Sequence, residues 1–436
     1  MKGLTMVRTI PMLLLATALA ACQLPPPAVP ADSLDMVARD YVRLSLTIGE
    51  KEDGYIDAYY GPAELQAAAK ADAPALTLGQ LSDRAIALRT RAAAFDRGST
   101  LDARRARFLV AQLTAAETRL KLMRGEKLSF ADEAEGEFGV RPTLAPLASF
   151  DPVLARIERL VPGPGPLASR VDAFQNRFNI PTARLKPVFD AAIAECKRRT
   201  LEHIALPANE AFDMAFVTGK SWSGYNYYQG NARSRIEINT DLPIRMSRAI
   251  DLGCHEGYPG HHVLNALLEE RLTKGRGWIE FSVYPLYSPQ SLIAEGSANY
   301  GIDLAFPGDD ALAFETRTLY PLAGLNPAEA PAYRALQVAM KDLAGARFTI
   351  AQQLLDGQID EPEALRLIQH YQLVSPERAK QSVAFTRQYR SYVINYGLGM
   401  DMVRASIELA GPSAAARWKR MEAIISEPTL PSDLRK

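Results

Sequence analysis

Residues 255–262 read HEGYPGHH, so three histidines and a glutamate surround a Pro-Gly pair. In the metal-binding pattern H-E-x-x-H the second histidine follows the first by four residues, and both imidazoles lie on one helix face. Pro259 occupies that position in this chain. Because its ring clashes with the carbonyl of His255, four residues back, a regular helix cannot run through the stretch.

The spacing of the histidines also excludes a shared metal ion on a regular helix. At about 100° per residue, His261 lies roughly 120° from His255, and His262 lies about 10 Å further along the axis. If Pro259 and Gly260 loop out as a bulge, His261 returns to the usual place of the second histidine. The competing geometry restarts the helix at Pro259, which suits the first turn, and makes His262 the ligand. We favour the bulge.

The stretch resembles the hallmark of a bacterial family known as domain of unknown function 885. That hallmark is an HE-x-x-PGHH sequence followed by a second glutamate in an EGWA-like segment. Residues 291–306, SLIAEGSANYGIDLAF, supply the second glutamate as Glu295. Residues 395–404, NYGLGMDMVR, are similar to the family's Tyr-x-x-Gly segment, with Tyr396 and Gly399 in the matching places. The resemblance is firm from about residue 210 onward.

The family resembles an outlying branch of the zinc metallopeptidases, and the dipeptidyl peptidase III group offers a parallel. The resemblance therefore implies a zinc-dependent peptidase with a mainly α-helical, zincin-like architecture, acting on a peptide substrate. Its implied zinc ligands are His255, His261 and Glu295. Zinc suits such a set of two imidazoles and a carboxylate.

The resemblance also implies roles around the metal. Glu256 is the expected general base. Tyr396 is expected to stabilise the oxyanion, with Tyr392 as the alternative. Asn299, one turn after Glu295, is expected to orient a ligand histidine, and His262 to support the site or replace His261 as ligand.

Two departures from the family keep another function open. Ser297 stands where the family has a tryptophan, and the Pro-Gly-Gln before the tyrosine segment is absent. The alternative is a non-catalytic, membrane-anchored lipoprotein that binds peptides or a protein partner, its histidines a hydrogen-bonded group without metal. The other histidines, His203 and His370, lie on predicted helices and are not expected to be ligands. Cys254 is left out because thiolate sites usually contain pairs of cysteines.

The N-terminus has the pattern of a targeting segment. Lys2 and Arg8 flank the start of an apolar run that ends in LAAC at residues 19–22. This ending resembles a bacterial lipobox, which implies a signal peptide over residues 1–22 and acylation of Cys22. The alternative is an ordinary signal peptide with an incidental cysteine. With a Pro-rich tether at 23–32, we expect a lipid anchor in a membrane of the bacterial cell envelope, on the periplasmic side.

The charge balance argues against one class of partner. Lysine plus arginine and aspartate plus glutamate number 50 each, and no basic run is interleaved with aromatics. No field of one sign attracts nucleic acid, so we expect none to bind. The breaker VPGPGP at 161–166 predicts a division between an N-terminal helical region, 33–160, and a catalytic region, 161–436.

Apolar residues at three- and four-residue spacing predict a mainly α-helical chain. The clearest helices are expected over 31–50, 101–123, 182–204 and 330–355. Residues 211–243 differ, and SRIEIN at 234–239 alternates as a strand does, so one small sheet should precede the metal helix. Its exposed edge would suit an extended peptide. Cys196 and Cys254 are too few for a disulfide framework, and we favour two free thiols over one bridge.

Overall fold

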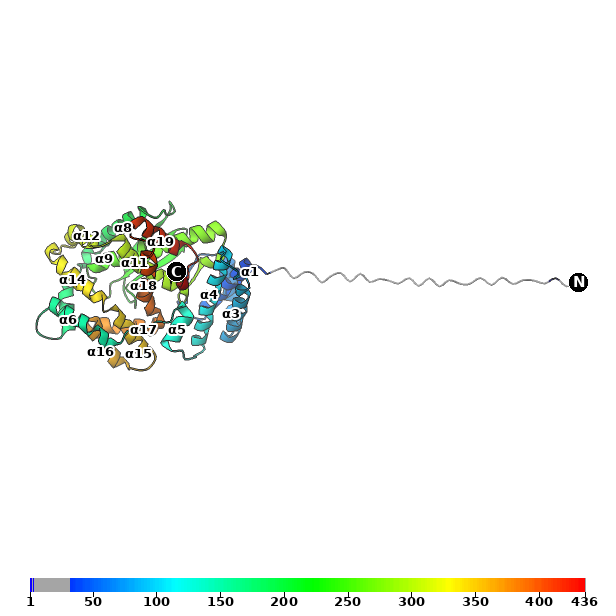
Figure 1. Ribbon diagram of the computed structural model, residues 1–436, viewed down its shortest axis with the longest axis horizontal. Coiled ribbons are helices and arrows are strands. Elements are labelled where there is room, and N and C mark those ends of the chain that lie inside the picture. Colours follow the sequence, from blue (N-terminus) through cyan, green and yellow to red (C-terminus); the bar gives the residue numbers. More distant parts are fainter. Residues whose placement is uncertain (2, 4–31, 436) are drawn as a thin grey trace. The chain divides into compact units, whose positions relative to one another are not determined.

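The structure of the protein is a computed structural model that describes residues 1, 3 and 32–435 (Figure 1). The chain from Leu34 onward forms one compact unit. The predicted signal peptide, Cys22 and nearly all of the tether lie outside the described residues. Within the described part, no helix has the length and apolar character needed to cross a membrane.

The predicted fold class, mainly α with a small sheet, is confirmed. The longest helix shows why. Helix α4 spans the predicted residues 101–123. It begins after Thr100, whose side chain accepts a hydrogen bond from the backbone N–H of Ala103. Its buried residues include Leu109, Leu113 and Leu120. The helices are α1 (Leu34–Gly49), α2 (Ala63–Asp72), α3 (Leu78–Ala93), α4 (Leu101–Met123), α5 (Phe130–Phe138), α6 (Asp151–Leu160), α7 (Leu167–Asn176), α8 (Leu185–Leu201), α9 (Ser247–Leu252), α10 (His261–Leu268), α11 (Pro289–Ala305), α12 (Asp310–Phe314), α13 (Tyr320–Ala323), α14 (Ala330–Lys341), α15 (Ala344–Leu355), α16 (Glu361–Gln372), α17 (Pro376–Tyr389), α18 (Leu398–Glu408) and α19 (Ala414–Ser426).

The single helix expected over 330–355 is two helices, α14 and α15. At their junction the backbone N–H of Leu343 donates to the carbonyl of Met340, three residues back, which tightens the turn and redirects the chain. The side chain of Asp342 pairs there with Arg156 of α6. The hydrophobic spacing carries no sign of this change because both halves keep an apolar face.

A three-stranded sheet precedes the HEGYPGHH stretch, as predicted. Its strands are β2 (Ala211–Val217), β3 (Gly224–Gly230) and β4 (Arg233–Asn239), in the order β2-β4-β3. Strand β4 runs parallel to β2 and antiparallel to β3, so that Met214 and Asn226 both lie opposite Ile236. Strand β3 therefore forms one edge of the sheet.

A second, two-stranded sheet was not predicted. Strand β1 (Ile56–Tyr59) pairs antiparallel with β5 (Val283–Pro285), which joins the DGYIDAYYGP stretch near the N-terminus to the second half of the chain. A pairing between segments so far apart leaves no local signal in the sequence. Residues on both sides of the predicted division at 161–166 share one hydrophobic core, and the breaker itself is the loop between α6 and α7.

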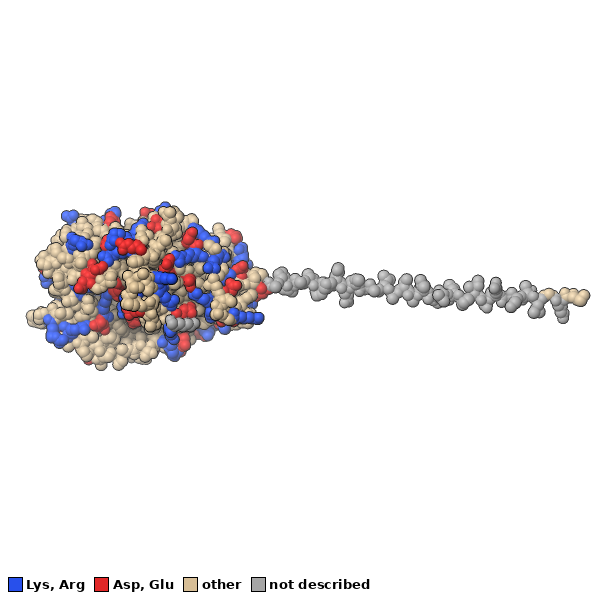
Figure 2. Space-filling model, turned by 45° about the horizontal axis from the view of Figure 1, so that its top comes forward, with Lys and Arg blue, Asp and Glu red and all other residues tan. Residues whose placement is uncertain are grey.

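The surface carries both signs of charge. On the face shown in Figure 2, lysine and arginine side chains are interspersed with aspartate and glutamate side chains over the compact unit. Inside, a smaller second cluster of apolar side chains lies among α6, α7 and α14–α17.

The expectation of two free thiols is wrong: Cys196 and Cys254 form a disulfide. Cys196 lies on α8, and Cys254 directly precedes His255. Helix α8 packs against the segment Gly253–Gly257, which carries Cys254 and His255. This packing brings the Cα atoms of the two cysteines to a separation of 5.5 Å. The bond ties the start of the HEGYPGHH stretch to a neighbouring helix.

Removing the disulfide should destabilise the protein. The cysteines are 58 residues apart in sequence, and closing a loop of that size contributes about 4 kcal/mol in the chain-entropy model. We expect the Cys196→Ala/Cys254→Ala variant to unfold at lower urea concentration than the oxidised protein. Dithiothreitol should lower the midpoint of the wild type and leave that of the variant unchanged. A wild-type midpoint insensitive to dithiothreitol would contradict the bond.

Candidate metal centre

The helix that carries His255 is interrupted before the second histidine. Helix α9 continues into a π-helical turn, Gly253–Gly257, the chain leaves helical geometry at Tyr258, and α10 begins at His261. The Tyr258–Pro259 peptide bond is cis. The expected bulge is therefore a complete break between two helical segments, and the restart comes at His261, two residues later than in the competing geometry.

Gly260 makes this break possible. A Cβ atom built on it would lie 1.7 Å from the carbonyl oxygen of His255, which no side chain can occupy. Its N–H donates to the carbonyl of Cys254 at 3.1 Å, so the chain folds back onto the segment it has just left. This close approach of backbone to backbone returns His261 to the side of His255.

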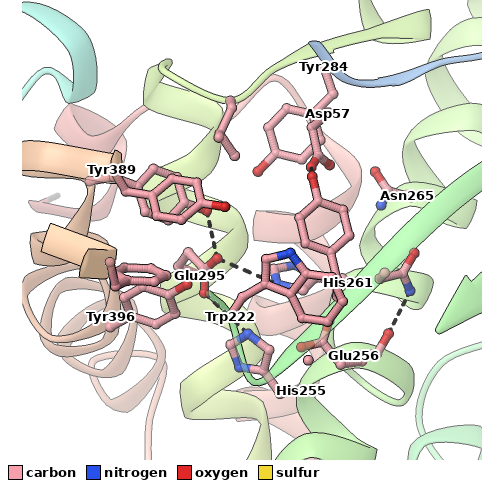
Figure 3. A pocket seen from close by; sticks show the side chains of 16 residues that line it. Asp57, Trp222, His255, Glu256, His261, Asn265, Tyr284, Glu295, Tyr389 and Tyr396 are labelled. Carbon is pink, nitrogen blue, oxygen red and sulfur yellow. Dashed lines mark hydrogen bonds and ion pairs between the residues drawn. The ribbon is translucent and has the colours of Figure 1, made fainter. Parts of the chain in front are cut away.

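Three side chains meet where the two helical segments face α11. His255, His261 and Glu295 each offer a ligand atom, and these atoms lie within 4.8 Å of one another (Figure 3). Nε2 of His255 is 3.2 Å from Oε2 of Glu295, and Nε2 of His261 is 3.7 Å from Oε1. Ligand atoms bound tetrahedrally at 2.0–2.1 Å are about 3.4 Å apart, so the two separations between the histidines and Glu295 are close to those around one zinc ion.

The hydrogen bonding at Glu295 also fits a cation. Its Oε2 is buried and makes no hydrogen bond among the described residues, although the imidazole of His255 lies beside it. Its Oε1 accepts from the hydroxyl of Tyr392 at 2.7 Å. One carboxylate oxygen is thus held in place by Tyr392 while the other lies beside the imidazole of His255, an arrangement that a shared metal ion would satisfy.

The charges of the cluster depend on one another. Burial alone would raise the pKa of Glu295, but the adjacent imidazoles of His255 and His261 hold it below its ordinary value. Burial opposes the charged form of His255, yet the Glu295 carboxylate raises its pKa. Burial lowers the pKa of His261 to about 4, so this imidazole is neutral at pH 7, the form that binds a metal.

Glu256 lies beside the cluster and against strand β3. A Cβ on Gly224 would lie 2.7 Å from Oε1 of Glu256, so a larger residue there would displace this carboxylate. The amide of Asn226 donates to the backbone carbonyl of Glu256 at 2.7 Å and fixes the turn. Burial raises the pKa of Glu256 to about 7, with His255 acting in the opposite direction. The side chain makes no hydrogen bond within the described part of the chain.

The two tyrosines have different positions. Tyr392 is buried and its hydroxyl is used by Glu295. The ring of Tyr396 stacks on that of His255 with centroids 6.4 Å apart, and its hydroxyl donates to no described residue. Both lie on the 3₁₀ segment Arg390–Tyr396, which is held by the buried carboxylate of Glu133 on α5 through Arg390 and Ser391. Tyr396 is therefore the tyrosine whose hydroxyl is free to contact a molecule in the cavity.

Asn299 does not orient a ligand histidine. Its amide donates to the backbone carbonyl of Glu295 at 2.9 Å and to that of Tyr396 at 3.4 Å. Because Asn299 lies one turn after Glu295 on α11, its side chain reaches the backbone carbonyl of that turn more easily than a histidine ring on another segment. The contact instead joins α11 to the segment that carries the tyrosine.

His262 points away from the cluster, although it is adjacent to His261. It is fully buried, with Nδ1 2.8 Å from the hydroxyl of Ser234 on β4 and Nε2 3.0 Å from Oε2 of Glu210. Burial opposes ionisation of Glu210, but its bonds with His262, Lys197 and Tyr258 lower its pKa to about 2. His262 thus fastens α10 to the sheet. The remaining histidines, His203 and His370, are exposed and lie outside the cluster.

Several residues at the site were not found from sequence. The cavity beside the cluster is also lined by Asp57 of β1, Tyr284 of β5 and Tyr225 of β3 (Figure 3). The hydroxyl of Tyr225 donates to Asp57. The aromatic-rich DGYIDAYYGP stretch was the available signal, but only the pairing of β1 with β5 brings it to the site.

Comparison with known proteins gives a likeness of fold. No protein-family model and no curated protein matches the chain. Among solved structures, the fold is similar to that of a "putative lipoprotein" from Colwellia psychrerythraea, with a TM-score of 0.50. The two chains are 14% identical over 85% of this chain and 72% of the other. At this identity the likeness concerns the fold alone.

Asp57 should make stability depend on pH. Burial raises its pKa from 3.8 to about 7, against the hydrogen bond from Tyr225. The folded state favours the neutral acid of Asp57. Its contribution to the free energy of unfolding is therefore complete below pH 3.8 and is lost as the pH rises through about 7.

We expect the metal-free wild type to lose more unfolding free energy than Asp57→Asn between about pH 4 and pH 8. The difference should be on the order of 1–3 kcal/mol, because Asp57 keeps some contact with solvent. Urea titrations across this range measure it, with the exposed Asp83→Asn as control. Parallel curves for wild type and Asp57→Asn would contradict the buried acid.

Proposed function

We propose that the protein is a zinc-dependent peptidase that hydrolyses peptide bonds. The observation that carries the proposal is the convergence of His255, His261 and Glu295 at separations that fit one zinc ion, with Glu256 beside them. When bound, zinc supplies positive charge that polarises a carbonyl and lowers the pKa of water towards ~7. Burial in a water-poor pocket strengthens such interactions.

The chain's own residues then have distinct tasks. Glu256 takes a proton from the attacking water and passes it to the leaving amine. The hydroxyl of Tyr396 donates to the oxygen that becomes negative, while Tyr392 holds Glu295 in place. An extended peptide suits the edge strand β3, whose residues Gly224 to Asn226 line the cavity.

We also propose that Cys22 is acylated and anchors the protein to a membrane of the cell envelope. The lipobox-like LAAC supports the anchor, and the solved structure of similar fold carries the description of a lipoprotein. Cys22→Ser should move the protein from the membrane fraction to the soluble fraction or leave its signal uncleaved. Unchanged fractionation and mature mass would contradict the anchor.

The metal proposal predicts a graded loss of zinc affinity. Protein prepared without a chelating tag should carry about one zinc per chain by elemental analysis. His255→Ala, His261→Ala and Glu295→Ala should each lose zinc affinity by orders of magnitude, whereas His262→Ala should lose about 10- to 100-fold at most. The exposed His203→Ala is the matched control and should bind zinc as the wild type does.

Zinc titrations of these variants decide between the adjacent histidines. If His262→Ala abolishes binding and His261→Ala does not, the assignment of His261 is wrong. If the wild type takes up no zinc, the peptidase proposal fails. Glu256→Gln should keep zinc and lose about 10²- to 10⁴-fold in turnover of peptides. Zinc binding without any turnover would favour a non-catalytic lipoprotein.

A further inference from the structure

A second cavity opens from the candidate metal centre. It has a volume of about 300 Å³ and shares His255, Glu256 and Tyr396 with the cluster's own pocket. Its wall also carries three guanidinium groups, those of Arg248, Arg347 and Arg378. Besides Glu256, Asp251 is the one carboxylate among the described residues that line it. Arginines therefore outnumber carboxylates in the lining of this cavity.

Arg347, on α15, has no anionic partner in the described part of the chain. Its Nε is buried without a hydrogen-bond partner, and its guanidinium carbon lies 5.1 Å from the ring centroid of Phe385 and 5.8 Å from that of Tyr396. Burial lowers its pKa, with little compensation from neighbouring charges. The two rings hold the cation through cation–π contacts but leave its Nε–H without an acceptor among the described residues. A buried donor left without a partner is costly, so this one is kept for something that enters the cavity.

The other two arginines are already engaged. Arg248 pairs with Asp251, and Arg378 donates to the backbone carbonyl of Pro243 at 2.9 Å. They add positive potential to the cavity, while Arg347 is the one of the three whose guanidinium has no hydrogen bond or ion pair with a described residue. The planar guanidinium fork matches a carboxylate, which it can bind through two parallel hydrogen bonds.

We propose that Arg347 binds a carboxylate of the peptide substrate, and that this is its C-terminal carboxylate. The inference rests on the proposed peptidase function for the nature of the substrate. Tyr396 lies between Arg347 and the cluster, 5.8 Å from the guanidinium carbon and 6.4 Å from the His255 ring. An extended peptide advances about 3.3–3.6 Å per residue, so a carboxylate held at Arg347 ends the chain within about three residues of the bond cleaved. The enzyme would then release short C-terminal pieces.

Two series of synthetic peptides of the same mixed sequences, one with free C-terminal carboxylates and one with C-terminal amides, test this assignment. With zinc-loaded wild type, mass spectrometry should show cleavage near the C-terminus of the free acids, and kcat/KM about 10- to 100-fold lower for the amides. Arg347→Gln should lower kcat/KM for the free acids by a similar factor, mainly through KM, and barely change it for the amides. Arg347→Lys should restore part of the loss.

Arg404→Gln is the matched control. Arg404 also lies over a ring, with its guanidinium carbon 5.8 Å from the centroid of Tyr300, but it does not line the cavity. The Arg404→Gln variant should cleave both series of peptides as the wild type does. Melting temperature and zinc content of Arg347→Gln should match the wild type, which separates loss of binding from loss of folding.

The outcomes distinguish a C-terminal carboxylate from a side-chain carboxylate. They also distinguish failure of the Arg347 assignment from failure of the peptidase proposal. If acids and amides are cleaved alike, but Asp- or Glu-containing peptides are preferred and the preference needs Arg347, the carboxylate is a side chain. If Arg347→Gln cleaves both series as the wild type does, the assignment is overturned. If the zinc-loaded wild type cleaves neither series, the peptidase proposal fails, and calorimetric titration of the same peptides decides the arginine site. Tighter binding of the free acids than of the amides, lost in Arg347→Gln, supports the assignment of Arg347. Equal binding of the two series, or no binding, overturns that assignment.

Discussion

The candidate site depends on a close contact between two helices, made by Gly296 on α11 and Gly399 on α18. A Cβ on Gly296 would lie 2.4 Å from the carbonyl oxygen of Gly399, and one on Gly399 would lie 2.7 Å from that of Leu292. Any larger residue would push the helices apart. Because Glu295 directly precedes one glycine and Tyr396 lies shortly before the other, this contact sets the carboxylate and the tyrosine side by side. The glycines of both motif-like segments thus act through packing rather than through chemistry.

Adjacent histidines have opposite environments because of where a helix begins. On α10, successive side chains diverge by about 100°, so His261 and His262 cannot face the same way. The break at Gly260 directs His261 to His255, and His262 then necessarily faces the sheet, where Ser234 and Glu210 accommodate it. The order of two identical residues decides which lies in the metal cluster.

Much of this architecture could be predicted from sequence. Hydrophobic spacing located α4 at both ends, alternation located β4, and the HEGYPGHH stretch with its downstream glutamate predicted which residues converge. What failed depended on contacts between distant segments. The Cys196–Cys254 disulfide and the Asp57–Tyr225 bond need α8 and β1 to be placed in three dimensions. Arg347 lies on an ordinary amphipathic helix, and it is distinguished only by having no anionic partner among the residues that the structure describes. The split of α14 from α15 was missed because it changes hydrogen bonding without changing polarity.

The pairing of β1 with β5 has a consequence for how the protein matures. Asp57 comes from near the start of the chain, the histidines from its middle and Tyr396 from near its end, and all line one cavity. Contacts between residues so distant in sequence form late, since a long loop must be closed before they are made. A chain still emerging during synthesis therefore holds no complete site. Whatever chemistry the cavity performs begins only after the segment that carries Tyr396 has packed against the segments that carry Asp57 and the histidines.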